Sequence, residues 1–215
     1  MPELEFGVEG AAAVPFCAAP MLALKLRVTN HGVDRVHAVA LDCQIRIEAQ
    51  RRRYSPAEKE QLVELFGEPN RWGQTLRSLL WTNASVSVPP FEGGTVVDLH
   101  VPCTADFNVL AGKYFSALED GKVPISLLFS GSVFYAREDG ALQVARIPWS
   151  AEAVYDLPIS AWTDLLDLYF PNVSWLSLRR DVFDRLYAYR TRRGLTSWEQ
   201  ALEELLERAV EDVPQ

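Results

Sequence analysis

The sequence is poor in the side chains that most often bind metals or act as nucleophiles. It holds three histidines and three cysteines among 215 residues, and no histidine lies at ligand spacing from a cysteine or another histidine. Metal carriers gather soft or imidazole ligands at one place, so the sequence predicts neither a metal site nor a bound cofactor. Cys17, Cys43 and Cys103 are odd in number and widely spaced, which argues against a disulfide framework.

Familiar catalytic motifs are also absent. The sequence contains no CxxC, HExxH, GxSxG, P-loop or dinucleotide-binding glycine pattern. His100 lies three residues before Cys103 in an expected strand, where positions three apart point to opposite faces, so a nucleophile pair is not expected. Carboxylates such as Glu203 and Glu207 fall opposite the apolar stripe of an expected helix, as on a solvated face. We therefore expect a protein that is not an enzyme and has no catalytic residues.

Positive charge is scarce, with 21 Lys and Arg against 29 Asp and Glu and a formal net charge of -8. An acidic protein repels phosphate groups, so nucleic acid is not an expected partner. No apolar run is long enough to cross a bilayer. The first residues, MPELEFGVEGAAAVPF, lack the basic flank and long apolar segment of a signal sequence. We expect a cytoplasmic protein without membrane contacts.

Alternating hydrophobic residues are abundant and predict β-strands. The clearest stretch is 123–149, in which apolar residues between Ile125 and Tyr135 share one face. Asp139-Gly140 then supplies the left-handed turn chemistry of a hairpin, and the chain returns over 142–147. This stretch predicts the central hairpin of a mostly antiparallel sheet.

Shorter alternating runs predict the remaining strands. A short edge strand is expected at 4–8. Only a turn at Asn30-His31-Gly32 separates the alternating runs 21–30 and 39–48, so we expect these two to pair as antiparallel neighbours. Further strand character lies at 86–88, 97–103 and 153–157.

Helical signals interrupt the strands twice and then fill the end of the chain. Ser55 and Glu58 fit a capping box that opens a helical insertion at about residues 55–80. A second insertion is expected at about 104–119. The second short helix of the first insertion would bury Leu76, Leu79 and Leu80. The helices after Pro158 would bury stripes that include Leu178, Val182, Leu186, Tyr189, Trp198, Leu202, Leu205 and Ala209, and Thr196 with Glu199 would form the last capping box.

These elements place the chain in the α+β class. We predict a mostly antiparallel β-sandwich over residues 1–158, with an immunoglobulin-like topology preferred and the two helical insertions included. Residues 159–215 are predicted to form a C-terminal three-helix subdomain packed on the sandwich. Alternation identifies strands and their faces but leaves their pairing order open.

Tryptophan beside arginine is the strongest signal for a binding surface, because both residues are enriched at interface hot spots. The predicted partner-binding residues are Arg71, Trp72, Trp175, Arg179 and Arg180. Surface solubility and helix-end charge are the alternative explanation for the arginines. The same alternative applies to the run 51–53.

Several stretches together resemble an uncharacterised bacterial family, a domain of unknown function, over nearly the whole chain. They are LRVTN (26–30), ALDCQIRIE (40–48), LFGEPNRWGQTLRSLLW (65–81), VPCTADF (101–107), LLFSGSVFY (127–135), IPW (147–149), LRRD (178–181) and GLTSWEQAL (194–202). Members of that family tend to be encoded beside uptake nickel–iron hydrogenase genes of actinobacterial type. The resemblance implies an accessory or assembly role, with hydrogenase subunits or maturation factors as partners, and it implies no known activity.

The favoured hypothesis is a non-enzymatic accessory or assembly protein that acts through protein–protein contacts. A chaperone-like or small-ligand binding module, using a groove between the sandwich and the C-terminal helices, is the alternative. A hydrolase without a familiar motif ranks third, because it would need a buried pair of titratable groups. The oligomeric state is left open.

Overall fold

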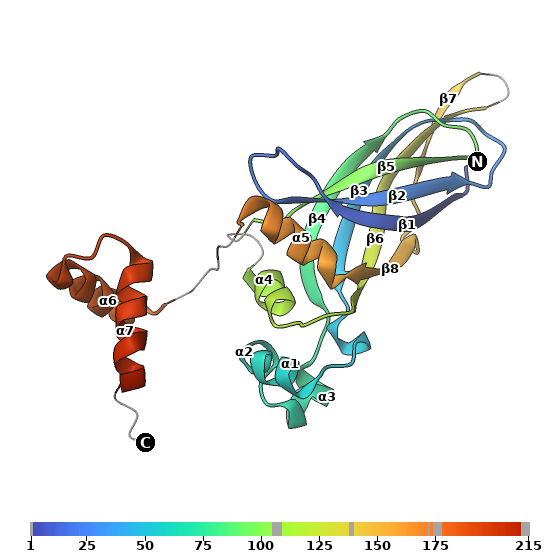
Figure 1. Cartoon of the computed structure of the whole chain (residues 1–215). Helices are drawn as coiled ribbons and strands as arrows, with labels where there is room; N and C mark the ends of the chain where they lie inside the picture. The colour runs from blue at the N-terminus through green and yellow to red at the C-terminus, as the bar shows by residue number, and fades with distance from the viewer. Residues whose placement is uncertain (1, 105–108, 138–139, 172, 174–177, 212–215) are drawn as a thin grey trace. The chain divides into compact units, whose positions relative to one another are not determined.

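The computed structural model describes residues 2–104, 109–137, 140–171, 173 and 178–211 (Figure 1). The chain divides into two compact units, Met1–Asn172 and Val173–Gln215, and each is described by itself. The first unit contains the strands and helices α1 to α5, and the second contains α6 and α7. No helix in the described ranges is both long enough and apolar enough to span a membrane.

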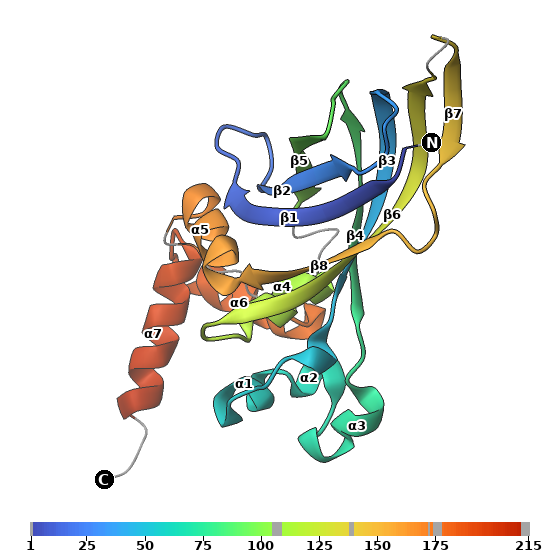
Figure 2. The ribbon, with the colours of Figure 1, turned by 90° about the vertical axis from the view of Figure 1, so that its right-hand side faces the viewer.

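The described strands of the first unit form two antiparallel sheets. One sheet has the order β1-β2-β5, and the other has the order β4-β3-β6, with β7 and β8 both paired to the far edge of β6 (Figure 2). The strands are β1 (Leu4–Ala13), β2 (Met21–Asn30), β3 (Val36–Ile47), β4 (Leu79–Val88), β5 (Gly94–Pro102), β6 (Lys122–Ala136), β7 (Leu142–Arg146) and β8 (Glu152–Pro158).

This order is immunoglobulin-like. The first, second and fifth strands make one sheet, and the third and sixth make the centre of the other. The predicted α+β class and β-sandwich are therefore confirmed. The two inner faces meet in one apolar core, whose fully buried side chains include Leu22, Leu24, Leu26, Ile45, Leu99, Ile125 and Leu127. Contacts of β4 with β5 and of β1 with β8 close the two sides of the sandwich.

The predicted central hairpin is confirmed by the pairing of β6 with β7, whose register runs from Ser132 opposite Arg146 to Ala136 opposite Leu142. Asp139 lies outside the described residues. After Pro148-Trp149 the chain continues as β8, which pairs with the same edge of β6 as β7 does. The strand expected at 153–157 lies within β8. Among the described strands β6 is the longest, and three other strands, β3, β7 and β8, pair with it.

The expected pairing of β2 with β3 is wrong, because the two strands lie in different sheets. Asn30, a buried residue at the end of β2, organises the crossing between the sheets. Its side-chain Nδ2 donates to the carbonyl of Asp34 at 2.8 Å, and its Oδ1 accepts from the backbone N–H groups of Glu3 and Gly32, both at 3.0 Å. Alternation correctly identified one buried face on each strand, and those faces meet across the sandwich.

The first helical insertion lies between β3 and β4. Ser55 and Glu58 form the predicted capping box, with the Glu58 N–H donating to Ser55 Oγ at 3.1 Å and the Ser55 N–H to Glu58 Oε2 at 2.9 Å. The predicted helix over Leu79 and Leu80 is wrong, because these residues begin β4 and pair with β3. The elements are η1 (Ala49–Arg51), α1 (Pro56–Gln61), α2 (Val63–Phe66), η2 (Pro69–Arg71) and α3 (Trp72–Thr75).

The second insertion is α4 (Val109–Ser116), and α5 (Ile159–Tyr169) follows β8. Helix α5 packs on β1, β2 and β8, and its Trp162 stacks on Phe115 of α4 with ring centroids 4.7 Å apart. The first unit therefore extends past the predicted boundary at residue 158, and the predicted three-helix subdomain loses its first helix to the sandwich unit. Packing of the remaining helices on the sandwich stays a prediction.

Candidate protein-binding surface

The second unit is a helical hairpin of α6 (Arg180–Arg193) and α7 (Trp198–Glu211). Gly194 ends α6 in the left-handed conformation with φ of 66°, and the following Leu195 N–H donates to the Arg190 carbonyl at 3.1 Å. The cap of α7 lies one residue later than Thr196, because Ser197 Oγ accepts from the Gln200 N–H at 3.1 Å. The end predicted for α6 is confirmed, and the capping pair of α7 is corrected by one position.

Aromatic and charged side chains join the two helices. The rings of Phe183 and Tyr187 lie with centroids 5.3 Å and 6.1 Å from that of Trp198, and the Arg190 guanidinium carbon lies 4.0 Å from the Trp198 centroid. Glu204 accepts hydrogen bonds from both Arg193 and Arg208. The bond from Arg193 lowers the pKa of Glu204, so this carboxylate is ionised at neutral pH.

Most of the apolar surface of this hairpin stays exposed. Among its described side chains only Ala201 is buried, and Leu206 is 66% exposed. The predicted burial of Leu178, Leu202, Leu205 and Ala209 is wrong, since all four are exposed. A helix normally buries its apolar stripe against other elements, and here the second unit provides only one partner helix. We name the exposed set the α6–α7 apolar face: Leu178, Phe183, Tyr187, Leu202, Leu205 and Leu206.

Trp72 lies in the core, not on a partner surface as predicted. It is 9% exposed, its indole N–H donates to the Gly67 carbonyl at 2.8 Å, and its ring packs edge-on against Tyr54 and Phe66. Gly67 ends α2 with a φ of +73°, which favours glycine, and Trp72 at the start of α3 packs against Phe66 at the end of α2. The neighbouring Arg71 is exposed.

Arg179 and Arg180 are exposed and lie at the N-terminal end of α6. The helix dipole disfavours cations there, so helix-end charge does not explain them, and a 3.0 Å ion pair with Asp181 offsets part of the repulsion for Arg179. Trp175 lies outside the described residues. Of the predicted partner-binding residues, these two arginines share a unit with the α6–α7 apolar face, whereas Arg71 and Trp72 belong to the other unit.

Arg52 and Glu58 form a polar cluster in the first unit, and their hydrogen bonds are made to other groups of the protein. The Arg52 guanidinium donates twice to Glu58, at 2.8 Å and 3.0 Å, and also to the carbonyls of Asp120 and Lys122. Glu58 accepts further bonds from the backbone N–H groups of Ser55 and Glu119. The cluster ties the first helical insertion to the turn before β6, and all four hydrogen bonds described for Arg52 go to groups of the protein itself. Sequence reasoning missed it, because Arg52 looked like one member of a surface run.

The histidines and cysteines form no reactive pair. His100 is exposed on β5, whereas the Cys103 thiol is buried and donates to the Val101 carbonyl at 3.3 Å. Burial raises the pKa of Cys103 to about 12, so the thiolate nucleophile is scarce at neutral pH. Within the described ranges, no group of three or more His, Cys, Asp or Glu side chains could hold a metal ion.

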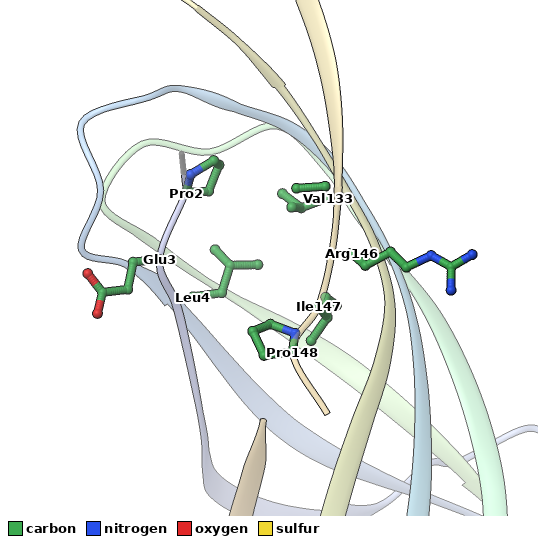
Figure 3. A pocket seen from close by; sticks show the side chains of 8 residues that line it. Pro2, Glu3, Leu4, Val133, Arg146, Ile147 and Pro148 are labelled. Atoms are coloured by element: carbon green, nitrogen blue, oxygen red, sulfur yellow. The ribbon is translucent and has the colours of Figure 1, made fainter. Parts of the chain in front are cut away.

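An apolar pocket of about 310 Å³ lies between the start of β1 and the β6–β7 hairpin (Figure 3). Leu4, Val133 and Ile147 point into it, whereas the charged ends of Glu3 and Arg146 point away. Here β1 faces the region where β7 gives way to Pro148. Pro2, Ala145 and Pro148 complete the lining.

Comparison with known proteins identifies the family of the chain. A family model described as "Family of unknown function (DUF6084)" matches residues 1–214. No curated protein matches the chain. Among solved structures, the CARDB domain of a Pyrococcus furiosus protein in complex with di-metal ions is 14% identical, with a TM-score of 0.29 over 73% of this chain and 87% of that one. A β-glucosidase from Kluyveromyces marxianus is 15% identical, with a TM-score of 0.28 over 72% of this chain and 15% of that one. TM-scores this low say nothing about what the chain binds.

Proposed function

The chain belongs to the family of unknown function DUF6084, and we propose that it is a cytoplasmic, non-enzymatic accessory protein that acts through protein–protein contacts. The observation that carries the proposal is the α6–α7 apolar face, on which aromatic and leucine side chains remain exposed. Large apolar side chains gathered on the exposed surface of a globular protein often mark an interaction site.

The composition of this surface supports a protein partner over a small ligand. Phe183 and Tyr187 supply large, rigid contact area, and Arg179 and Arg180 add charged groups that can pair with carboxylates. The groups are spread along two helices instead of converging on a pocket. Helices with exposed leucines at this spacing typically lie against a complementary helix or groove of another protein.

The finer proposal is that the partner is a bacterial nickel–iron hydrogenase subunit or one of its maturation factors. It rests on the family resemblance described above. The side chains favour a protein-binding role over metal delivery, because carriers use clustered soft or imidazole ligands.

The test is a quantitative pull-down from the native host with the tagged full-length protein. Leu206→Glu should abolish recovery of the partner, because it places a charge on the apolar face at a side chain that is itself exposed. Gln200→Glu is the matched control: it adds the same charge to the exposed surface of the same helix, and its side-chain oxygen can still accept from Thr196.

Stoichiometric recovery of hydrogenase subunits or maturation factors by the native sequence and Gln200→Glu, but not by Leu206→Glu, would support the proposal. Equal recovery by all three would remove the α6–α7 apolar face from it. Recovery of the bait alone would contradict an accessory role with these partners.

A further inference from the structure

Strand β7 leaves one edge of its sheet open. Within the described part of the chain it pairs only with β6. Arg137 N–H donates to the Ala141 carbonyl at one end of this pairing, and Ile147 N–H donates to the Gly131 carbonyl at the other. Along an antiparallel strand, successive residues direct their backbone N–H and C=O groups alternately to the strand on one side and to the opposite side. The odd-numbered residues of β7 therefore bond to β6, and Leu142, Val144 and Arg146 direct their N–H and C=O groups to the open edge.

The apolar pocket lies on the inner side of this open edge. Ala145 and Ile147 line it from β7 and its extension, and Leu4 lines it from the start of β1 (Figure 3). A strand added beside β7 would lie about 4.8 Å away and would point every second side chain toward the core side of the sheet. Those side chains would enter the pocket and cover apolar groups that now contact solvent.

The outer side of the edge has a different character. Leu142 and Val144 are 61% and 59% exposed, and beside them the Arg146 side chain is exposed and points away from the pocket. Arg146 forms no ion pair with any described residue. On a protein with net charge -8, a free arginine at an open strand edge selects a partner that brings its own carboxylate.

We propose that the open edge of β7 binds an extended peptide segment of another protein by strand addition. The segment carries small apolar side chains at alternate positions, which enter the pocket, and an acidic side chain on the opposite face, which pairs with Arg146. Backbone hydrogen bonds to Leu142, Val144 and Arg146 supply affinity, and the pocket and the arginine supply specificity. This inference does not depend on the α6–α7 apolar face, because different residues carry it and test it.

Binding of a synthetic peptide to the full-length protein tests the proposal. The probe is fluorescein-labelled Val-Ser-Val-Asp-Val-Ser-Val, and its dissociation constant is measured by fluorescence polarisation. Val144→Pro removes the N–H that points to the open edge but no bond to β6, and proline is tolerated on edge strands. Affinity should fall at least about tenfold, because both a hydrogen bond and the edge geometry are lost. Val144→Thr keeps the N–H and should bind within about twofold of the native sequence.

A charge exchange tests the acidic preference. Arg146→Glu should weaken binding of the Asp peptide and favour the peptide with Lys at that position. Circular dichroism and thermal unfolding establish that each variant folds.

Three results would overturn the proposal. The first is no saturable binding to the native protein at millimolar peptide, and the second is equal affinity for Val144→Pro and Val144→Thr. The third is a dimer in sedimentation that Val144→Pro dissociates, since a second copy would then occupy the edge.

Discussion

Arg52 and Glu58 form a two-bond ion pair whose side chains are only 9% and 4% exposed. The pair lies six residues apart in sequence, but its remaining bonds reach Glu119, Asp120 and Lys122. It therefore joins two parts of the chain that are distant in sequence.

Replacing Arg52 by Ala should lower the free energy of unfolding by about 3–5 kcal/mol, because Glu58 would remain buried without its cation. Urea or guanidinium unfolding, monitored by tryptophan fluorescence, measures the change. Arg53→Ala is the matched control: Arg53 is the exposed neighbour, and its loss should change stability by less than about 0.5 kcal/mol. Similar losses in both variants would refute a special role for the buried pair.

The Arg52–Glu58 ion pair should make the free energy of unfolding depend on pH. Burial alone would raise the pKa of Glu58, but hydrogen bonds from Arg52 and from the backbone of Ser55 and Glu119 outweigh it and leave the pKa lowered. A lowered pKa in the folded state contributes stability that is complete above the ordinary glutamate range and disappears as pH falls through the folded value. Unfolding curves between pH 7 and about pH 3 should show this decline. Glu58→Gln, which cannot titrate, should show a shallower decline, and an unchanged slope would argue against this assignment.

Gly131 is a second position where the fold permits one residue type. A Cβ added there would lie 2.0 Å from the Ala40 carbonyl oxygen on β3, and its φ is +135°. Gly131→Ala should therefore destabilise the protein by about 3 kcal/mol or more, through steric overlap with backbone and through strain. Gly7→Ala, in β1, is the control: no atom lies within 4 Å of its added Cβ, so the change should be neutral or slightly stabilising. Thermal unfolding of the two variants gives the comparison.

The three cysteines should differ sharply in reactivity. Burial raises the pKa of Cys43 and of Cys103 to about 12, whereas Cys17 is partly exposed. Iodoacetamide at pH 8 should therefore modify one site in the native protein and three after unfolding, as counted by intact mass. Peptide mapping should locate the native modification at Cys17. Rapid native alkylation of Cys43 would show that the sandwich core opens readily.

Local patterns predicted much of the sandwich. The alternation in 123–149 identified β6 and β7 because side chains on a strand alternate faces whatever the strand pairs with. The capping box at Ser55 and the helix end at Gly194 were equally predictable, since both depend on residues only a few positions apart.

Long-range relationships could not be predicted in this way. Alternation on β2 and β3 could not distinguish pairing within a sheet from packing across the sandwich, and the deciding interactions belong to Asn30. The spacing of Leu79 and Leu80 fits the apolar stripe of a helix, but pairing with β3 outweighs this local preference and places both residues in β4. The burial of Trp72 depends on its contacts with Tyr54, Phe66 and the Gly67 carbonyl, and the open edge of β7 depends on which strands lie beside it.

The attachment of three strands to β6 has a consequence for how the protein is made. By Pro102 a growing chain has all the strands of the β1-β2-β5 sheet but only β3 and β4 of the other. The apolar faces that will form the core then have no complete second layer until Lys122–Ala136 has been synthesised and paired with β3. Vectorial synthesis thus passes through a stage that exposes Leu22, Leu24 and Leu26, and aggregation is a hazard for such unfinished sheets. Conditions that slow translation between residues 102 and 136 would prolong that exposure.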